Sequence, residues 1–312
     1  MQLLYLLEKI RIPGLNELML LITQLGDETA FLMIALVVFW CVDKRRGYYV
    51  MAVGFVGTIT NQFLKLLCRI PRPWVLDEQF TILEAAREGA SGYSFPSGHT
   101  QSAVGTFGCL AATTQRKWLR WSYIALAALV GFSRMYVGVH TPYDVLVGAA
   151  SAIALVFLLK PLIYGSGDRG MKLLLGGMLL VSVAYLLFVE LWPFPADVDA
   201  HNLQSGTENA YTLLGCVIGV VTVYFADQKW LNFQVKAVWW AQILKVLCGL
   251  ILVLAVKSGL KAPLNALFAG HHAARAVRYF LVVLTAGIVW PMTFSRFSRL
   301  GTGKRAEGGA QV

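Results

Sequence analysis

The sequence predicts an all-α protein, a bundle of helices that crosses a membrane several times. Of its 312 residues, 57% are hydrophobic and only 14% are charged, and the mean hydropathy is +0.62. Soluble domains carry about 25% charged residues. The chain also repeats apolar runs of about 17–25 residues, the length that spans a bilayer as a helix. Because lipid offers no hydrogen-bond partners, such runs satisfy their backbone groups internally as helices.

About nine segments are predicted to cross the bilayer. Their approximate limits are residues 28–42, 48–67, 99–115, 119–137, 143–163, 171–191, 210–226, 236–256 and 278–295. Ahead of them, residues 1–27 form two amphipathic pieces broken at Pro13-Gly14, a pattern that favours a position along the membrane interface. After them, residues 299–312 form a Gly-rich tail that we expect to be disordered.

Basic residues in the loops predict the orientation. One set of loops and the tail hold Lys44, Arg45, Arg46, Arg116, Lys117, Arg120, Lys160, Arg169, Lys172, Lys229, Lys236, Arg296, Arg299, Lys304 and Arg305. The opposite set holds fewer, and fewer still once three cations of the motifs described below are set aside. Cytoplasmic loops are enriched in Lys and Arg. We therefore expect a multi-pass protein of the cell membrane, with a cytoplasmic C-terminus and the motifs at the extracytoplasmic face.

The net charge of +10 does not indicate nucleic-acid binding. The basic residues lie in short loops between apolar runs and form no stripe interleaved with aromatic residues. The lipid bilayer is the expected partner. No feature of the sequence indicates an oligomeric state.

The first motif, residues 65–73, lies at the outer end of the second apolar segment and holds Lys65 and Arg72. Pro71 and Pro73 stiffen the backbone on both sides of the arginine. A guanidinium offers a planar fork for phosphate oxygens, and an ammonium adds a point charge. The alternative is that both side chains are interfacial anchors whose heads reach water.

The second motif, residues 94–100, places Pro96-Ser97-Gly98-His99 directly before an apolar run. This pattern predicts a helix N-terminus, where exposed N–H groups and the helix dipole favour an anion. Gly98 allows a phosphate to approach the backbone, and Ser97 offers a hydroxyl donor. The alternative is an ordinary helix cap, with His99 as a polar residue of the interface.

The third motif, residues 133–144, contains Arg134, His140 and Asp144. Thr141-Pro142 predicts an N-cap followed by a proline in the first helical turn, which brings Asp144 near His140. A carboxylate on one ring nitrogen of a histidine leaves the other nitrogen free as a nucleophile. The alternative is a histidine at the membrane edge with a capping aspartate, although an arginine near the end of a span is costly without a function unless its head reaches water.

The joint pattern Lys-x6-Arg-Pro, Pro-Ser-Gly-His and Ser-Arg-x5-His-x3-Asp resembles the type 2 phosphatidic acid phosphatase (PAP2) family, in its membrane lipid phosphatase branch, which is similar to the vanadium haloperoxidases. The resemblance covers roughly residues 48–163. It implies that His140 is the nucleophile, that Asp144 orients it, and that His99 is the general acid and then the base. The phosphoryl oxygens would be held by Lys65, Arg72, Ser97, Gly98 and Arg134.

This inventory implies phosphoryl transfer without a cofactor or a metal, because cations and a helix N-terminus stabilise the charge on the transferred group. His271, His272 and His201 lack a carboxylate at ligand spacing. We interpret them as loop histidines and expect no metal site.

The resemblance predicts a catalytic core over residues 28–165 and additional C-terminal transmembrane helices over residues 166–298. The expected function is an integral membrane phosphatase that hydrolyses a lipid phosphate or pyrophosphate through a phosphohistidine. One alternative is a phosphotransferase that uses the same site. Another is a lipid transporter or flippase, since the spans exceed the catalytic core. The sequence does not select one lipid phosphate as the substrate.

Overall fold

The computed structural model describes residues 1–90 and 92–300, and every regular element within those residues is a helix. The predicted all-α class is therefore confirmed. Most of the predicted disordered tail, residues 301–312, lies outside the described residues. The chain divides into two compact units. Unit 1 comprises residues 1–35 and 49–210, and unit 2 comprises residues 36–48 and the chain from residue 211 onward.

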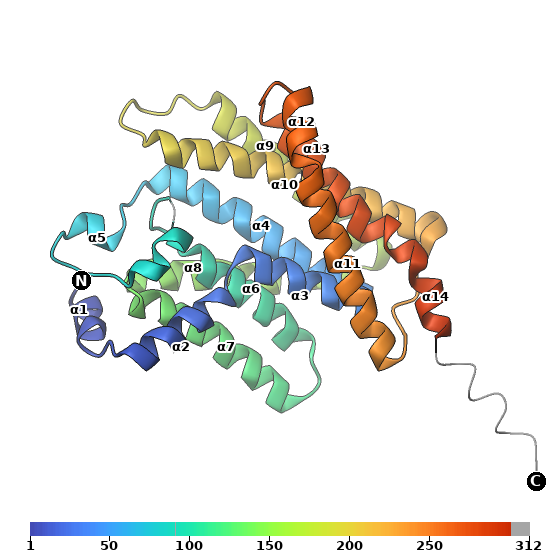
Figure 1. The fold of residues 1–312 in the computed structure, drawn as a ribbon, viewed down its shortest axis with the longest axis horizontal. Coiled ribbons are helices and arrows are strands. Elements are labelled where there is room, and N and C mark those ends of the chain that lie inside the picture. Colours follow the sequence, from blue (N-terminus) through green and yellow to red (C-terminus); the bar gives the residue numbers. More distant parts are fainter. Residues whose placement is uncertain (91, 301–312) are drawn as a thin grey trace, which may run out of the picture. The chain divides into compact units, whose positions relative to one another are not determined.

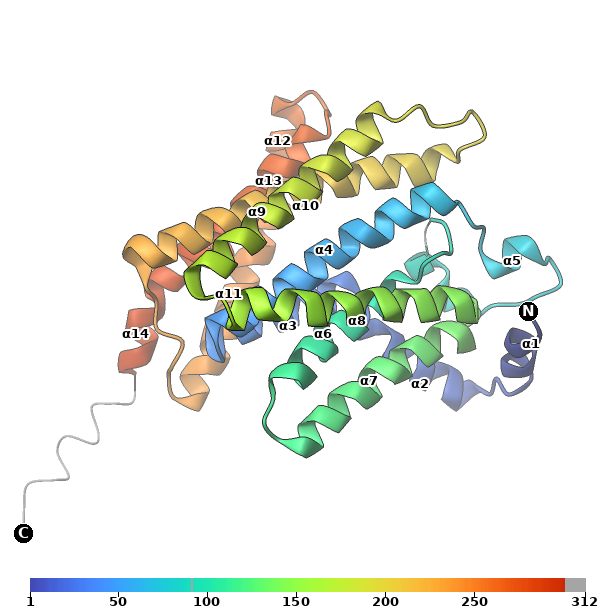
Figure 2. The same ribbon diagram turned by 180° about the vertical axis from the view of Figure 1, so that it is seen from behind.

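Unit 1 is built around α6, which packs against both α7 and α8 (Figures 1 and 2). Its elements are α1 (Gln2–Lys9), α2 (Pro13–Gln24), the start of α3 (Glu28–Cys41), most of α4 (Lys44–Cys68), α5 (Pro73–Leu76), η1 (Glu84–Ala86), η2 (Glu88–Ala90), α6 (Gly98–Thr113), α7 (Lys117–Tyr136), α8 (Pro142–Tyr164), α9 (Gly167–Leu191) and the start of α10 (Ala200–Ala226). Small residues on α6 and α7, including Ala103 and Ala127, are buried where these two helices meet.

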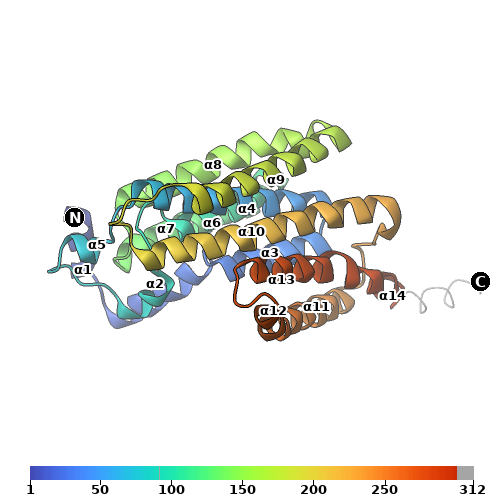
Figure 3. The same ribbon diagram turned by 90° about the horizontal axis from the view of Figure 1, so that it is seen from above.

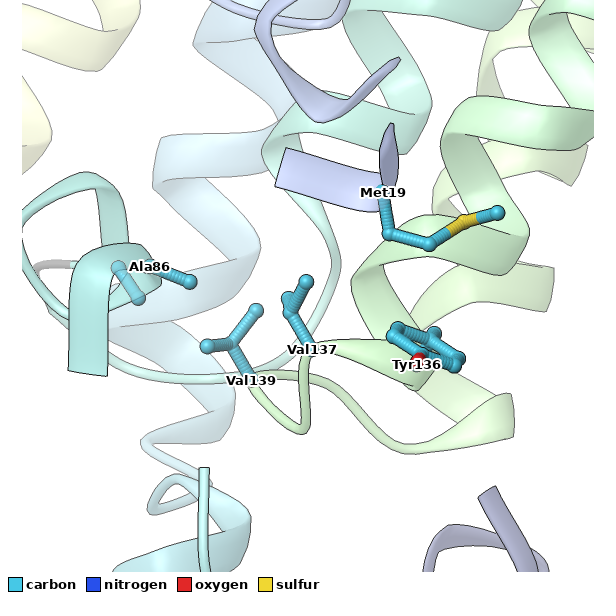
Figure 4. Close-up of a cluster of buried hydrophobic side chains, with 6 residues drawn as sticks. Met19, Ala86, Tyr136, Val137 and Val139 are labelled. Atoms are coloured by element: carbon cyan, nitrogen blue, oxygen red, sulfur yellow. The ribbon is translucent and has the colours of Figure 1, made fainter. Parts of the chain in front are cut away.

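The loop between α7 and α8 is anchored by a buried apolar cluster. Figure 4 shows Tyr136, Val137 and Val139 of this segment beside Met19 of α2 and Ala86 of η1. All three residues of the segment are fully buried. Burial of this apolar surface holds the loop in one conformation. The residue that follows the cluster in the chain is the predicted nucleophile.

Half-buried Arg11 fixes the same loop by bonding to the loop's main chain. Nε of Arg11 donates to the carbonyl of Tyr136 at 3.0 Å, and Nη1 donates to the carbonyl of Thr81 at 2.8 Å. Gly138 has φ +91°, and a Cβ there would lie 2.8 Å from Nη2 of Arg11. Glycine is needed at this position both for the backbone conformation and for the space that the arginine occupies.

Unit 2 contains the remaining helices, and α11 lies beside α13 (Figure 3). Its elements are the ends of α3 and α10, the start of α4, η3 (Asp227–Leu231), α11 (Trp239–Gly259), α12 (Lys261–Leu267), α13 (Ala273–Leu284), η4 (Thr285–Val289), η5 (Pro291–Thr293) and α14 (Phe294–Arg299). Nζ of Lys44 contacts the buried carboxylate of Asp227 at 2.7 Å. The buried ammonium of Lys245 donates to the carbonyl of Val235 at 2.9 Å and lies over the Phe294 ring.

Six helical stretches of the described chain are long and apolar enough to cross a membrane, or seven if α2 and α3, which bend by 53°, count as one span. The chain is therefore a multi-pass membrane protein, but the predicted count of nine is not confirmed. Against the count of seven, two predicted spans account for the difference, and against six the third is residues 28–42. α6 has only 16 residues, and α7 carries Lys117, Arg120 and Arg134 within 20 residues. Both helices are shorter or more polar than an isolated span in lipid.

Candidate active site

The second motif forms the N-terminus of α6, as the sequence predicts. Ser97 is the N-cap, and its Oγ accepts from the main-chain N–H of Thr100 at 3.4 Å. The main-chain N–H of Ser97 donates to the carbonyl of Asp144 at 2.9 Å. Nδ2 of Asn61 donates to the carbonyl of Pro96 at 3.3 Å. The turn is therefore fixed against α8 on one side and α4 on the other.

The third motif begins α8 with a reciprocal cap, and the predicted N-cap at Thr141 is confirmed. Oγ1 of Thr141 accepts from the N–H of Asp144 at 3.3 Å, and Oδ2 of Asp144 accepts from the N–H of Thr141 at 2.7 Å. Oγ of Ser94 donates to the same Oδ2 at 2.6 Å. Nδ1 of His140 lies 3.5 Å from this oxygen. Two donors, the N–H of Thr141 and the hydroxyl of Ser94, thus hold the carboxylate in the position where it faces the imidazole.

His140 is buried among polar groups. Its Nε2 accepts from Nη1 of Arg72 at 2.9 Å. Its Nδ1 lies 3.5 Å from Oδ2 of Asp144, 3.4 Å from Oγ of Ser94 and 3.5 Å from the same Nη1. Burial, followed by the positive charge of Arg72, holds the pKa of His140 well below its ordinary value. The ring is therefore neutral at pH 7. With the hydrogen on Nδ1 directed at the carboxylate, Nε2 carries the lone pair.

Main-chain carbonyls hold both cations of the first motif. Nε of Arg72 donates to the carbonyl of Gly92 at 2.9 Å, and Nη1 donates to the carbonyl of Val139 at 3.0 Å. The ammonium of Lys65 donates to the carbonyl of Tyr93. Both cationic side chains are buried. This geometry disagrees with interfacial anchors, whose charged heads reach water.

Arg134 lies in the last turn of α7 and is only 1% exposed. Its Nη1 donates to Oγ1 of Thr23 in α2 at 2.8 Å. Its Nε and Nη2 are buried and have no hydrogen-bond partner among the described residues. Leaving buried donors unpaired costs free energy that an anion with several oxygens would recover. Two donors of this guanidinium are therefore left without a partner by the described residues.

A cavity of about 410 Å³ joins five of the predicted residues: Lys65, Arg72, Gly98, His99 and His140. Ser97, Arg134 and Asp144 do not line it. The Ser97 hydroxyl serves the α6 cap, and Asp144 lies behind the imidazole. His99, in the first turn of α6, is half-buried and makes no side-chain hydrogen bond to another described residue.

The site also contains residues to which the sequence assigned no role. Ser94 bonds the carboxylate of Asp144, Thr23 holds Arg134, and Asn61 holds the turn before α6. Ser94 falls inside the second motif, but no spacing rule marks it. Thr23 and Arg134 are 111 positions apart in the sequence. Among the described residues, no group of three or more His, Cys, Asp or Glu side chains is placed to hold a metal ion.

Two family models match separate parts of the chain. The model described as PAP2 superfamily matches residues 45–167, a range that contains all three motifs. The model described as PAP2 superfamily phosphatase, transmembrane extension, matches residues 211–304.

Curated proteins similar to the chain include several phosphatases. Undecaprenyl-diphosphatase BcrC of Bacillus subtilis is 30% identical over 46% of this chain and 72% of its own length. Phosphatidylglycerophosphatase B of the same organism is 30% identical over 48% of this chain and 76% of its own length. Glucose-6-phosphatase 3 of Mus musculus is 25% identical over 70% of this chain and 74% of its own length. No solved structure matches the chain significantly.

Proposed function

Because the chain belongs to the PAP2 superfamily and is a multi-pass membrane phosphatase, we propose that it hydrolyses a lipid phosphate or pyrophosphate through a phosphohistidine on His140. One observation carries this proposal. A buried, neutral imidazole has Nδ1 directed at the carboxylate of Asp144 and Nε2 directed at the cavity cation Arg72. This tautomer places the nucleophilic lone pair on Nε2, where it accepts from Nη1 of Arg72. A phosphoryl oxygen that takes over this donor would bring phosphorus to Nε2.

In the first step, Nε2 of His140 attacks phosphorus while the bond from phosphorus to the leaving oxygen breaks. The negative charge of the bound phosphate favours protonation of His99, which takes up a proton from solvent and gives it to that oxygen. The alcohol or phosphate product therefore leaves with one added proton. Lys65, Arg72 and Arg134, with the N–H groups at the start of α6, stabilise the charge on the equatorial oxygens. Asp144 stabilises the positive charge that develops on the ring.

In the second step, a water molecule attacks the phosphohistidine and gives a proton to His99. The bond between phosphorus and Nε2 breaks, inorganic phosphate is released, and His140 returns to its neutral form. His99 is then protonated again, ready for the next leaving group. The half-exposed position of His99 supports this role, because the same side chain must meet both the leaving group and water.

The names of the relatives support a range of phosphorylated substrates for this chain. They include an undecaprenyl diphosphate, a phosphatidylglycerol phosphate and a sugar phosphate. The loop cations support a site at the extracytoplasmic face of the cell membrane and a cytoplasmic C-terminus. A substrate with its tail in the outer leaflet would present its headgroup at that depth.

The proposal is tested by phosphate release from purified protein. Phosphatidic acid, phosphatidylglycerol phosphate, sphingoid-base phosphate and polyprenyl pyrophosphate, each labelled at the terminal phosphate, are supplied in detergent micelles. We expect release from at least one of them and a labelled protein intermediate in acid-quench samples neutralised at once. Its label is expected to be lost in acid and retained in base, as for a phosphoramidate. Turnover with label that is lost in base instead would contradict a histidine nucleophile.

Replacing Gly148 by alanine is expected to lower kcat/KM about 100-fold, because a misplacement of about 1 Å has an effect of that size. A Cβ at this position of α8 would lie 2.6 Å from the carbonyl oxygen of Ser97. The helix N-terminus and His99 would have to shift away from His140. The matched control is Gly176→Ala in α9, where a Cβ meets no atom within 4 Å. Equal kcat/KM values for the two variants would contradict the conclusion that the contact between Gly148 and the Ser97 carbonyl positions the site.

A further inference from the structure

Beyond the residues proposed to bind phosphate, the cavity is lined by polar side chains on four α-helices and the short 3-10 helix η2. In α4, Thr58, Asn61 and Gln62 follow the spacing that places them on one face with Lys65. The other polar residues are Asp27 and Glu28 at the start of α3, Gln101 and Ser102 in α6, Glu88 in η2, and Ser205, Glu208 and Asn209 in α10. Among the described lining residues, Phe31 is the one large apolar side chain.

Polar side chains within membrane-spanning helices are costly unless they face water or a polar ligand. Two lining donors show that the folded chain leaves this part of the cavity unsatisfied. Nε2 of Gln101 and Oγ of Ser102 are buried and have no hydrogen-bond partner among the described residues. Gln101 itself is only 2% exposed. A buried donor of this kind is normally paired, so its partner must come from the cavity.

The backbone of α4 makes room for this amide. A Cβ on Gly57 would lie 1.6 Å from Nε2 of Gln101, so only glycine permits the amide to occupy its position against α4. Gly105, one turn further along α6, is also near this amide, at 3.9 Å for its added Cβ. The two glycines leave space for the Gln101 side chain between α4 and α6. Packing alone does not explain why a side chain with an unpaired donor occupies this space.

We infer that this part of the cavity binds a neutral leaving group with several hydroxyls, such as glycerol or a sugar. The inference rests on the proposed function and specifies the substrate of the same site. Hydroxyls both donate and accept, so they can pair with the amides and with the carboxylates of Asp27 and Glu28. Those carboxylates would repel a second phosphate. An acyl or prenyl chain would leave the buried donors unpaired.

The same chemistry has two sources, a neutral sugar headgroup carried by a lipid and a soluble polyol phosphate. We compare glucosyl diacylglycerol 6-phosphate in vesicles, soluble glycerol 3-phosphate, and hexadecyl phosphate, whose leaving group has no other hydroxyl. The wild-type protein is expected to prefer at least one hydroxylated substrate over hexadecyl phosphate by more than tenfold in kcat/KM. Activity on glycerol 3-phosphate would assign a soluble source, and activity on the vesicles alone would assign a lipid.

Three variants test the residues. Gln101→Leu removes the amide of Gln101, and Gly57→Ala displaces it. Asn209→Leu removes a second amide, which lines the cavity from α10. Each is expected to reduce the ratio of kcat/KM for the preferred hydroxylated substrate to that for hexadecyl phosphate by about tenfold. Thr60→Val is the matched control, because Thr60 lies on α4, does not line the cavity and bonds only its own helix. Its ratio is expected to match the wild type.

Two results would overturn the inference. One is a wild-type protein that hydrolyses hexadecyl phosphate as efficiently as both hydroxylated substrates. The other is an unchanged ratio in all three variants when they fold normally by circular dichroism. Either result leaves the proposed phosphatase intact, because phosphate is still released. Failure of the proposed function would appear instead as no release from any substrate.

Discussion

His140→Ala is expected to lower phosphate release about 10,000-fold or more, because a covalent route is lost when its nucleophile is removed. Nε2 of His140 lies 2.9 Å from Nη1 of Arg72. In the variant no ring nitrogen occupies that position. The carboxylate of Asp144, which lies behind the imidazole, cannot replace it as the nucleophile. The measurement is the initial rate on the best substrate of the panel, with circular dichroism as the check on folding.

A substrate whose leaving group needs no proton distinguishes the proposed roles of His99 and His140. With p-nitrophenyl phosphate, His99→Ala is expected to release one nitrophenol per protein rapidly and then stall, because the phosphohistidine forms but water is not activated. His140→Ala should give no such burst. A burst in the His140 variant, or turnover within tenfold of the wild type, would assign the nucleophile to another residue.

Arg134→Met is expected to lower kcat/KM about 1,000-fold, which is within the range for a group that stabilises transition-state charge. The same change is expected to raise the free energy of unfolding by about 1 kcal/mol. The guanidinium is buried, and Nε and Nη2 lack partners in the described chain, so methionine removes an uncompensated buried charge. A residue kept for packing would show the opposite change in stability. The measurements are steady-state kinetics and thermal unfolding in detergent.

Oxyanion binding provides the control for this prediction. Vanadate should raise the unfolding midpoint of the wild type, since it binds only the folded state, and should have little effect on Arg134→Met. Thr23→Val removes one anchor of the guanidinium and keeps the charge. It should cost about tenfold in kcat/KM, the size of one hydrogen bond. An Arg134→Met protein that is less stable than the wild type and still gains stability from vanadate would contradict the assignment.

Local chemistry explains which parts of the fold were predictable. The starts of α6 and α8 follow from Ser97 and Thr141, because an N-cap acts within three residues of itself. The number of spans does not follow from apolar runs, since α6 and α7 are short or charged and pack together inside unit 1. The limits of the two units fall within α3, α4 and α10. A helix that continues through a boundary leaves no linker in the sequence to mark it.

The candidate site was predictable to the extent that its chemistry lies within motifs. The eight predicted residues include five that line one cavity, with Asp144 directly behind His140. Ser94, Thr23 and Gln101 acquire their roles only through tertiary contacts with other helices. A serine, threonine or glutamine in an apolar sequence is also an ordinary helix residue. The residue type alone therefore does not indicate a role in the site, and the role becomes evident only from the surrounding helices in the fold.

One oxygen atom belongs at once to a helix end and to the reaction centre. Oδ2 of Asp144 accepts the N–H of Thr141, which closes the first turn of α8, and the same atom faces His140. Fraying of that turn would therefore also remove the carboxylate that orients the proposed nucleophile, His140. In the proposed mechanism, loss of the α8 N-cap and loss of activity therefore occur together, because both depend on the same carboxylate oxygen.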